Sequence, residues 1–249
     1  LDTLGIILAG WTSNNKYALL GAIRSAAQLV SFEIPLGLTI LCVVIISGSL
    51  NLQDIAVQQG VFSPEVQYLF GIKSLGIEVQ SIGGILAWNV VRMPLFFILF
   101  ILYFIASLAE ANRAPFDIPE AESELVGGFH TEYAGMRWAL LFLSEYGMML
   151  LVSLLGVILF WGAWYSPFPN IGPIRLADWT NGLPGSVYAT IAGFFWLLLK
   201  TYILIGIQMW VRWTLPRLRV DQLMYLCWKV LTPFVLIFVA ISALWSLFM

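Results

Sequence analysis

The sequence has few charged residues and lacks most side chains on which metal and redox sites depend. Only 10% of its 249 residues are charged, against about a quarter in an ordinary soluble domain. It holds one histidine, His130, and two cysteines, Cys42 and Cys227, which form no CxxC or Cys/His cluster. No zinc, haem or iron–sulfur ligand set is therefore visible. We expect two buried free thiols, with a disulfide as the open alternative.

Several short motifs are missing as well. The sequence contains no G-x-G-x-x-G, no Walker A loop and no HExxH, so a dinucleotide, a nucleoside triphosphate and a catalytic zinc have no obvious site. It also has no basic run of the kind that binds nucleic acid. We therefore expect no bound cofactor, no metal and no catalytic redox group in this chain.

Apolar residues, in contrast, make up 60% of the chain and come in long blocks. A helix of about 20 apolar residues spans a hydrocarbon core of about 30 Å. The predicted fold class is all-α: a polytopic transmembrane helix bundle, forming a single integral membrane domain over residues 1–249. The opening LGIILAGW is too short to span and is predicted to belong to a partial first span. Five full spans are predicted at 29–50, 82–108, 136–164, 187–210 and 225–248.

Basic residues are distributed unevenly over the connecting loops. The loops 11–28, 109–135 and 211–224 share one side of the predicted bundle and carry most of them, namely Lys16, Arg24, Arg113, Arg212, Arg217 and Arg219. The opposite loops carry only Lys73 and Arg175. Cytoplasmic loops of membrane proteins are enriched in Lys and Arg. We therefore expect the first set of loops to face the cytoplasm.

The segment 110–132 concentrates acidic residues between two apolar runs. It holds six of the chain's 14 acids, Glu110, Asp117, Glu120, Glu122, Glu124 and Glu132. Carboxylates this close repel one another, so some are expected to hold protons near neutral pH and to titrate as a coupled set. The segment is thus either a proton-carrying set or an acidic loop that docks a basic partner. Apolar neighbours such as Phe116 and Phe129 favour packing over simple solvation.

Three charges fall inside predicted spans, where each costs about 2.5–3.5 kcal/mol on insertion scales. They are Glu33, Glu145 and Lys200. At 1.5 Å per residue, Glu145 and Lys200 lie roughly 13 and 15 Å from the same membrane face. We predict that these two share a polar layer. The alternative is that each pairs locally or extends its charge toward an interface.

Three motifs resemble those of a known family. They are PFDIPEAESEL at 115–125, followed by Gly128, Glu132 and Tyr133; SNNKYALLGAIR at 13–24, leading to SFE at 31–33; and PRLRVDQLM at 216–224. In this order they closely resemble the signature of the H subunit of proton-pumping NADH:quinone oxidoreductase, respiratory complex I. The mitochondrial counterpart is NADH dehydrogenase subunit 1. The resemblance covers essentially the whole chain.

The resemblance implies a subunit of eight transmembrane helices, of which this chain would lack the first two and most of the third. Such a subunit forms much of the quinone tunnel and couples quinone reduction to proton translocation through buried carboxylates. Quinone is then the substrate, while FMN and iron–sulfur clusters lie in partner subunits. The implied partners are iron–sulfur and 49-kDa-type subunits of the peripheral arm, small membrane-arm subunits and lipid. The implied location is the bacterial plasma (inner) membrane or the mitochondrial inner membrane.

The resemblance also assigns roles by position, in an enzyme subunit that is not active alone. Proton coupling falls to Glu33, Glu110, Asp117, Glu120, Glu122, Glu124, Glu132, Glu145 and Lys200. Tunnel and docking roles fall to Arg24, Arg113, Phe129, Arg217, Arg219 and Asp221. Three alternatives stay open: the related membrane subunit of a membrane-bound hydrogenase, a stand-alone cation or proton transporter, and a passive anchor for a soluble redox module. The sequence shows no inverted repeat of the kind that transporters usually have.

Overall fold

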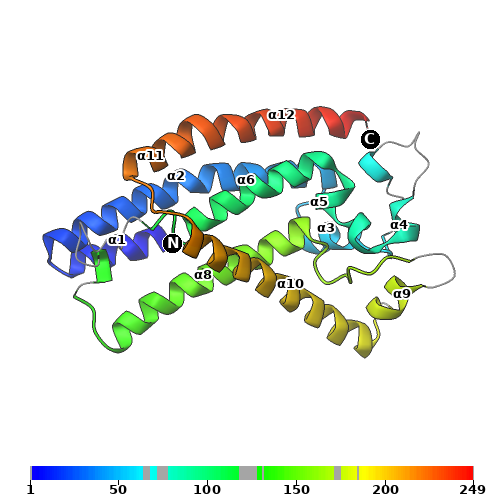
Figure 1. Ribbon diagram of the computed structural model, residues 1–249, viewed down its shortest axis with the longest axis horizontal. Coiled ribbons are helices and arrows are strands. Elements are labelled where there is room, and N and C mark those ends of the chain that lie inside the picture. The colour runs from blue at the N-terminus through cyan, green and yellow to red at the C-terminus, as the bar shows by residue number, and fades with distance from the viewer. Residues whose placement is uncertain are drawn as a thin grey trace. The chain divides into compact units, whose positions relative to one another are not determined.

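The computed structural model describes residues 2–63, 68–71, 78–117, 128–130, 132–170, 175–183 and 185–248. Within these ranges the chain forms helices and turns and no strand, which confirms the predicted all-α class for the described residues. Figure 1 shows the helices in chain order. The acids Glu120, Glu122 and Glu124 lie outside the described residues, as does Lys73.

Four helical stretches among the described residues are long and apolar enough to cross a membrane. They are Lys16–Ser47 (α2), Met136–Phe160 (α8), Val187–Thr214 (α10) and Val220–Leu247. The last one joins α11 (Val220–Tyr225), the π-helical segment η5 (Leu226–Leu231) and α12 (Thr232–Phe248). These stretches correspond to four of the five predicted full spans.

The remaining predicted span, 82–108, is not one helix. It contains the end of α4 (Val79–Ile82), then η3 (Gly84–Ala87), α5 (Asn89–Arg92) and finally α6 (Pro94–Glu110). Gly83 and Gly84 have φ of 62° and 64°, a conformation that glycine adopts without steric cost and that ends a helix. Pro94 then suits the first position of a new helix, where its missing N–H costs nothing. The apolar composition concealed these breaks.

The predicted loop 11–28 is mostly helical. α1 covers Asp2–Thr12 and α2 begins at Lys16, so the connection shrinks to residues 13–15. Asn14 takes a φ of 51°, which Asn tolerates better than most residues. Asn15 Oδ1 accepts a hydrogen bond from the N–H of Tyr17 at 3.0 Å, as a helix N-cap does. The orientation of this turn toward the cytoplasm stays a prediction.

The described contacts divide the chain into two compact units. The first comprises Leu1–Gly37, Phe104–Val152 and Ile205–Phe234; the second comprises Leu38–Tyr103, Ser153–Leu204 and Val235–Met249. Helices α2, α6, α8, α10 and α12 (Thr232–Phe248) contribute residues to both units. The second unit also holds the short helices α3 (Leu52–Gln58) and α9 (Leu176–Asn181). The predicted single membrane domain stays a prediction.

Both cysteines are buried and free, as expected. Cys42 and Cys227 have no exposed surface. Cys227 Sγ donates to the carbonyl oxygen of Ser31 at 3.0 Å, so α2 and η5 are joined by this thiol within the first unit. These cysteines therefore behave as small core residues.

Candidate functional site

The candidate site lies in the first unit and starts where α6 ends. The Arg113 N–H donates to the carbonyl of Leu108, and the Asn112 N–H donates to that of Ala109, both at 3.2 Å. Together with a φ of 47° at Asn112, this is the Schellman arrangement that closes a helix C-terminus. Gln28 of α2 adds a hydrogen bond to the Ala109 carbonyl at 2.9 Å. The cap therefore fixes the direction in which the chain leaves α6, and with it Arg113.

A short 3₁₀ turn, η4 (Gly128–His130), brings a second side chain to the site. It approaches α2 so closely that a Cβ added to Gly21 would lie 2.9 Å from Gly128 Cα. Phe129 is buried and packs in a cluster with Ile6, Ala22 and Leu29. The glycine contact and the buried ring therefore hold His130 in place, with its ring 4.0 Å from that of Phe129.

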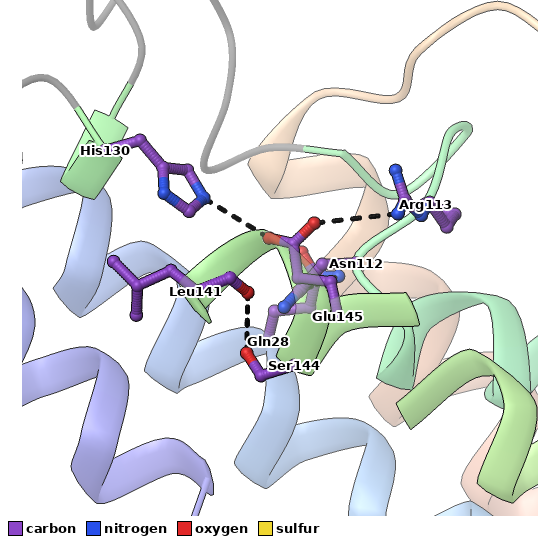
Figure 2. Close-up of polar contacts among 7 residues, drawn as sticks. All are labelled: Gln28, Asn112, Arg113, His130, Leu141, Ser144 and Glu145. Carbon is purple, nitrogen blue, oxygen red and sulfur yellow. Dashed lines mark hydrogen bonds and ion pairs between the residues drawn. The ribbon is translucent and has the colours of Figure 1, made fainter. Parts of the chain in front are cut away.

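Glu145, on α8, lies between these two groups. Its Oε2 is 3.7 Å from Arg113 Nη2, and its Oε1 is 3.4 Å from His130 Nε2. Figure 2 shows the carboxylate with His130 on one side and Arg113 on the other. The side chains of Glu145 and Arg113 are only 10% and 7% exposed. The Arg113 guanidinium also lies 4.3 Å above the Tyr146 ring, which adds a cation–π attraction.

A cavity of about 220 Å³ adjoins this carboxylate. Its lining residues are Gly5, Ile6, Glu110, Ala111, Asn112, Phe129, Leu141, Ser144, Glu145 and Met148. It is smaller than the roughly 300–1,000 Å³ of typical small-molecule sites. Two carboxylates, Glu110 and Glu145, thus face a shared space that suits water better than a whole quinone.

Asp117 forms a second ion pair in the same unit. Its Oδ2 accepts a hydrogen bond from Arg217 Nη2 at 3.2 Å; the Asp117 side chain is 6% exposed and that of Arg217 is 50% exposed. Burial raises the pKa of Asp117, and the nearby Glu145 charge acts in the same direction, while Arg217 lowers it. The net shift is upward. Asp117 therefore keeps its proton to higher pH than an exposed aspartate, while the coupled titration predicted for the acidic segment stays a prediction.

Lys200, on α10, lies in the second unit and has a different environment. Its ammonium donates to the carbonyl oxygens of Trp161, Ala163 and Tyr165 at 2.7, 3.1 and 2.6 Å. It also lies 4.2 Å above the Trp88 ring. These carbonyls follow the last residue of α8, where the helix dipole is negative. All three N–H groups of the ammonium therefore have acceptors in main-chain atoms.

The chain around these carbonyls is held by two further side chains. Gln59 donates to the carbonyl of Ile158 at 2.9 Å and accepts from the N–H of Gly162 at 3.0 Å. Asn89 donates to the carbonyl of Leu159 at 2.8 Å. Lys200 is thus one of three side chains that close the C-terminus of α8. Because Lys200 and Glu145 belong to different units, their shared polar layer stays a prediction.

The other predicted site residues are more exposed. Glu33, Glu132, Arg219 and Asp221 lie at the surface, and Arg24 is partly buried. Glu132 accepts a hydrogen bond from Asn15 Nδ2 at 2.9 Å. Their predicted roles are untested.

Sequence reasoning missed four residues that shape the site: Gln28, Asn112, His130 and Tyr146. His130 was identified only as the single histidine, yet its position between two acid-rich motifs was a usable signal. Gln28 interrupts an apolar stretch, AAQLV, and this interruption was a second usable signal. Asn112 and Tyr146 carried no pattern that would distinguish them.

In the described part of the chain, neither a metal centre nor a larger cavity competes with this site. Among the described residues, no group of three or more His, Cys, Asp or Glu side chains could hold a metal ion. A larger cavity, of about 610 Å³, lies in the second unit between α3, α9 and α10. Its described lining contains no charged side chain, so it offers no group for proton transfer.

Comparison with known proteins gives a consistent result. The chain matches the NADH dehydrogenase family over residues 1–243. It is 55% identical over 253 residues to the NADH-quinone oxidoreductase H 2 subunit of Cytophaga hutchinsonii, an alignment that covers 100% of this chain and 69% of that protein. It is 49% identical to the NADH-quinone oxidoreductase H subunit of Chlorobaculum parvum, an alignment that covers 98% of this chain and 61% of that relative. It is also 49% identical to the NADH-quinone oxidoreductase H subunit of Chlorobium luteolum, where the alignment covers 100% of this chain and 59% of that relative. The chain therefore spans about 59–69% of the length of these relatives.

Proposed function

Because the chain belongs to the NADH dehydrogenase family, we propose that it serves as a membrane subunit of NADH:quinone oxidoreductase. In this role it lines part of the quinone tunnel and couples quinone reduction to proton translocation. Quinone is the substrate of the assembled enzyme, and the flavin and iron–sulfur clusters reside in partner subunits. Alone, the chain has no activity.

The observation that supports this proposal is the position of Glu145. A buried carboxylate with a cation on one side and an imidazole on the other can exchange a proton with the imidazole without changing the net charge of the cluster. Imidazole is also the side chain that most readily gains or loses a proton at physiological pH. Glu145 and Glu110 face one cavity. We infer that water in this cavity passes protons between the carboxylates.

Reducing a quinone to a quinol consumes electrons and protons together. The electrons come from an iron–sulfur cluster of a partner subunit, and the appearance of negative charge on the reduced quinone attracts protons toward the acidic segment. Glu145, held by Arg113 and His130, responds to that change in field. Asp117, whose pKa is raised by burial, is a second carboxyl that responds to the same change in field.

The exposed ends of this unit suit docking of the peripheral arm. Arg217 and Arg219 lie at the surface beside Asp221, in the connection between α10 and α11 and at the start of α11. Arg217 keeps its position through Asp117. We propose that a soluble iron–sulfur or 49-kDa-type subunit binds here, on the cytoplasmic side.

We also propose that α6 serves as the fifth membrane span despite its length of 17 residues.

Glu145→Gln in the assembled complex tests the proposal. We expect intact assembly and roughly a 100-fold loss of quinone reductase activity, which is the lower end of the effect of removing a proton-transfer group. Ser144→Ala is the matched control, because Ser144 lines the same cavity and donates only to its own helix, at the Leu141 carbonyl. Full activity and full pumping in Glu145→Gln would argue strongly against the proposal. Glu120→Gln and Glu124→Gln extend the test to the rest of the acidic motif.

Purification from native membrane separates the remaining alternatives. Co-migration with flavin and iron–sulfur subunits supports an oxidoreductase subunit or an anchor, and excludes a stand-alone transporter. Sensitivity to a quinone-site inhibitor then distinguishes a tunnel subunit from an anchor.

A further inference from the structure

A small void lies beside Arg113, on the side formed by α8 and α10. Its volume is about 10 Å³ and its lining residues are Arg113, Tyr146, Met149, Gln208, Met209 and Arg212. This is about the smallest space that admits one water molecule. All six residues belong to the first unit. The void therefore connects the cluster at Glu145 with α10.

The orientation of the Gln208 amide follows from its neighbour. Ser107 Oγ donates its proton to the Phe104 carbonyl at 2.7 Å, so toward Gln208 it can only accept. Gln208 Nε2 donates to this Ser107 Oγ at 3.3 Å. The amide nitrogen of Gln208 therefore faces Ser107 Oγ, and the amide oxygen points away from Ser107.

Two of the residues that line the void carry buried polar atoms of opposite kind without hydrogen-bond partners within the described ranges. Gln208 is 3% exposed, and its Oε1 has no hydrogen-bond donor among the described residues. Arg113 is 6% exposed, and its Nε and Nη2 have no hydrogen-bond acceptor in the described part of the chain. Burying such atoms without partners is costly, and native structures usually satisfy them with protein or ordered water. A water in the void that accepts from Arg113 and donates to Gln208 would satisfy an unpaired donor and the unpaired acceptor together.

We propose that this void is an ordered-water site, and that Gln208 is a positioning residue that holds Arg113 against Glu145 through that water. The water accepts a hydrogen bond from the Arg113 guanidinium and donates one to Gln208 Oε1. Ser107 and Phe104 anchor Gln208 in turn. The Arg113 cation would then be fixed from α10 as well as by its contact with Glu145 at 3.7 Å. The functional part of this inference rests on the proposed function, whereas the water site itself does not.

The first test is a density map of the assembled complex at a resolution that shows ordered water. We expect a water at hydrogen-bond distance, about 2.7–3.2 Å, from both Gln208 Oε1 and Arg113. Gln208→Met, which has similar volume and no oxygen, should lose this water. An empty void in the unaltered complex, where other buried waters are visible, would overturn the inference.

The second test measures turnover. We expect Gln208→Met to lower the kcat of quinone reduction about five-fold, as the loss of one hydrogen bond near the site would, with the KM for quinone unchanged. Gln208→Glu keeps an acceptor oxygen, and the Ser107 hydroxyl can rotate to donate to the carboxylate, so this variant should retain both the water and most of the turnover. Met209→Leu is the control, because Met209 lines the void without a polar role. Equal turnover in Gln208→Met and the unaltered complex would refute the positioning role.

Glu145→Gln, measured beside these variants, separates the two proposals. A loss of activity in Glu145→Gln with normal turnover in Gln208→Met would remove the positioning role of Gln208 alone. Normal activity in both would remove the proposed function, and the density map would still decide the water site. If Gln208→Met does not assemble, the map of the unaltered complex and the turnover of Gln208→Glu decide instead.

Discussion

Glu145 and Lys200 are both buried charges on long apolar helices, but their partners differ in kind. Glu145 is held by two side chains, Arg113 and His130, and faces a cavity of about 220 Å³. Lys200 is held by three main-chain carbonyls and an aromatic ring. Side-chain partners can move or change charge, whereas carbonyls at a helix end do neither. The surroundings of Glu145 are therefore suited to a change of state, and those of Lys200 to a fixed role.

This contrast bears on the predicted role of Lys200 in proton coupling. An ammonium that donates all three of its hydrogen bonds must give one up before it can release a proton. Its contacts close the C-terminus of α8 together with Gln59 and Asn89. We therefore favour an anchoring role for Lys200, and the proton role stays a prediction that the following variant tests.

Lys200→Met gives the largest expected effect. It leaves three buried carbonyls without their donor, which should lower the free energy of unfolding by about 3 kcal/mol or more, because each unsatisfied buried acceptor costs about 1–3 kcal/mol. Thermal unfolding in detergent and the yield of assembled complex measure this loss. Lys229→Met is the control, because Lys229 is exposed in η5 and should change stability by less than about 0.5 kcal/mol. Normal stability combined with lost pumping in Lys200→Met would reverse our assignment and make Lys200 a proton carrier.

Gly21→Ala should have an intermediate effect on the side of Glu145. The new Cβ would meet backbone atoms of Gly128 and Phe129 at 2.9–3.2 Å, so η4 must shift and carry His130 away from Glu145. We expect a loss of stability of about 1–3 kcal/mol together with lower quinone reductase activity. Gly37→Ala, also on α2, meets nothing within 4 Å and should stabilise the helix by about 0.5–1 kcal/mol. Equal behaviour of the two variants would show that the close approach does not position His130.

Asp117→Asn should have the smallest effect, seen in the pH dependence of stability. Burial raises the pKa of Asp117 above its ordinary value of about 3.9. At pH values between the pKa of Asp117 in the unfolded state and its higher pKa in the folded state, the folded state binds more protons. The free energy of unfolding therefore falls as pH rises through that range. Asp117→Asn should flatten this slope in melting temperatures measured between about pH 4 and 8.

Two further variants check the assignment of this slope to Asp117. Arg217→Gln should extend the falling slope to higher pH, because Arg217 lowers the pKa of Asp117. Asp221→Asn, at an exposed position of α11, should leave the slope unchanged. An unchanged slope in Asp117→Asn would mean that another group causes it.

Sequence reasoning identified the charged residues of both clusters but not the groups that contact them. It named Glu145, Arg113, Asp117, Arg217 and Lys200 because charge in an apolar chain is conspicuous. Its shared polar layer of Glu145 and Lys200, inferred from equal depth, stays a prediction, and it did not predict the contacts of Glu145 with Arg113 and His130. Depth fixes the position along a helix but not the direction in which a side chain points, so helix packing had to supply these pairs.

The helix boundaries show the same limit. Apolar runs located four of the five predicted spans, because the length of hydrocarbon to be crossed fixes the length of the run. They failed at 82–108, where Gly83, Gly84 and Pro94 break the helix inside an apolar stretch. They also missed the helical start of α2, since polar residues beyond the apolar run continue the helix.

The sequence by itself determined the helical membrane class, the family and the identity of the charged residues, because composition and local motifs do not depend on distant contacts. The tertiary structure alone decided that Glu145 meets side chains and a cavity while Lys200 meets main-chain carbonyls. It also decided that Gln208, which carries no sequence signal, borders a void beside Arg113. The physical reason is that the energy of a buried charge depends on which atoms surround it, and folding brings those atoms together from segments that are far apart in the sequence.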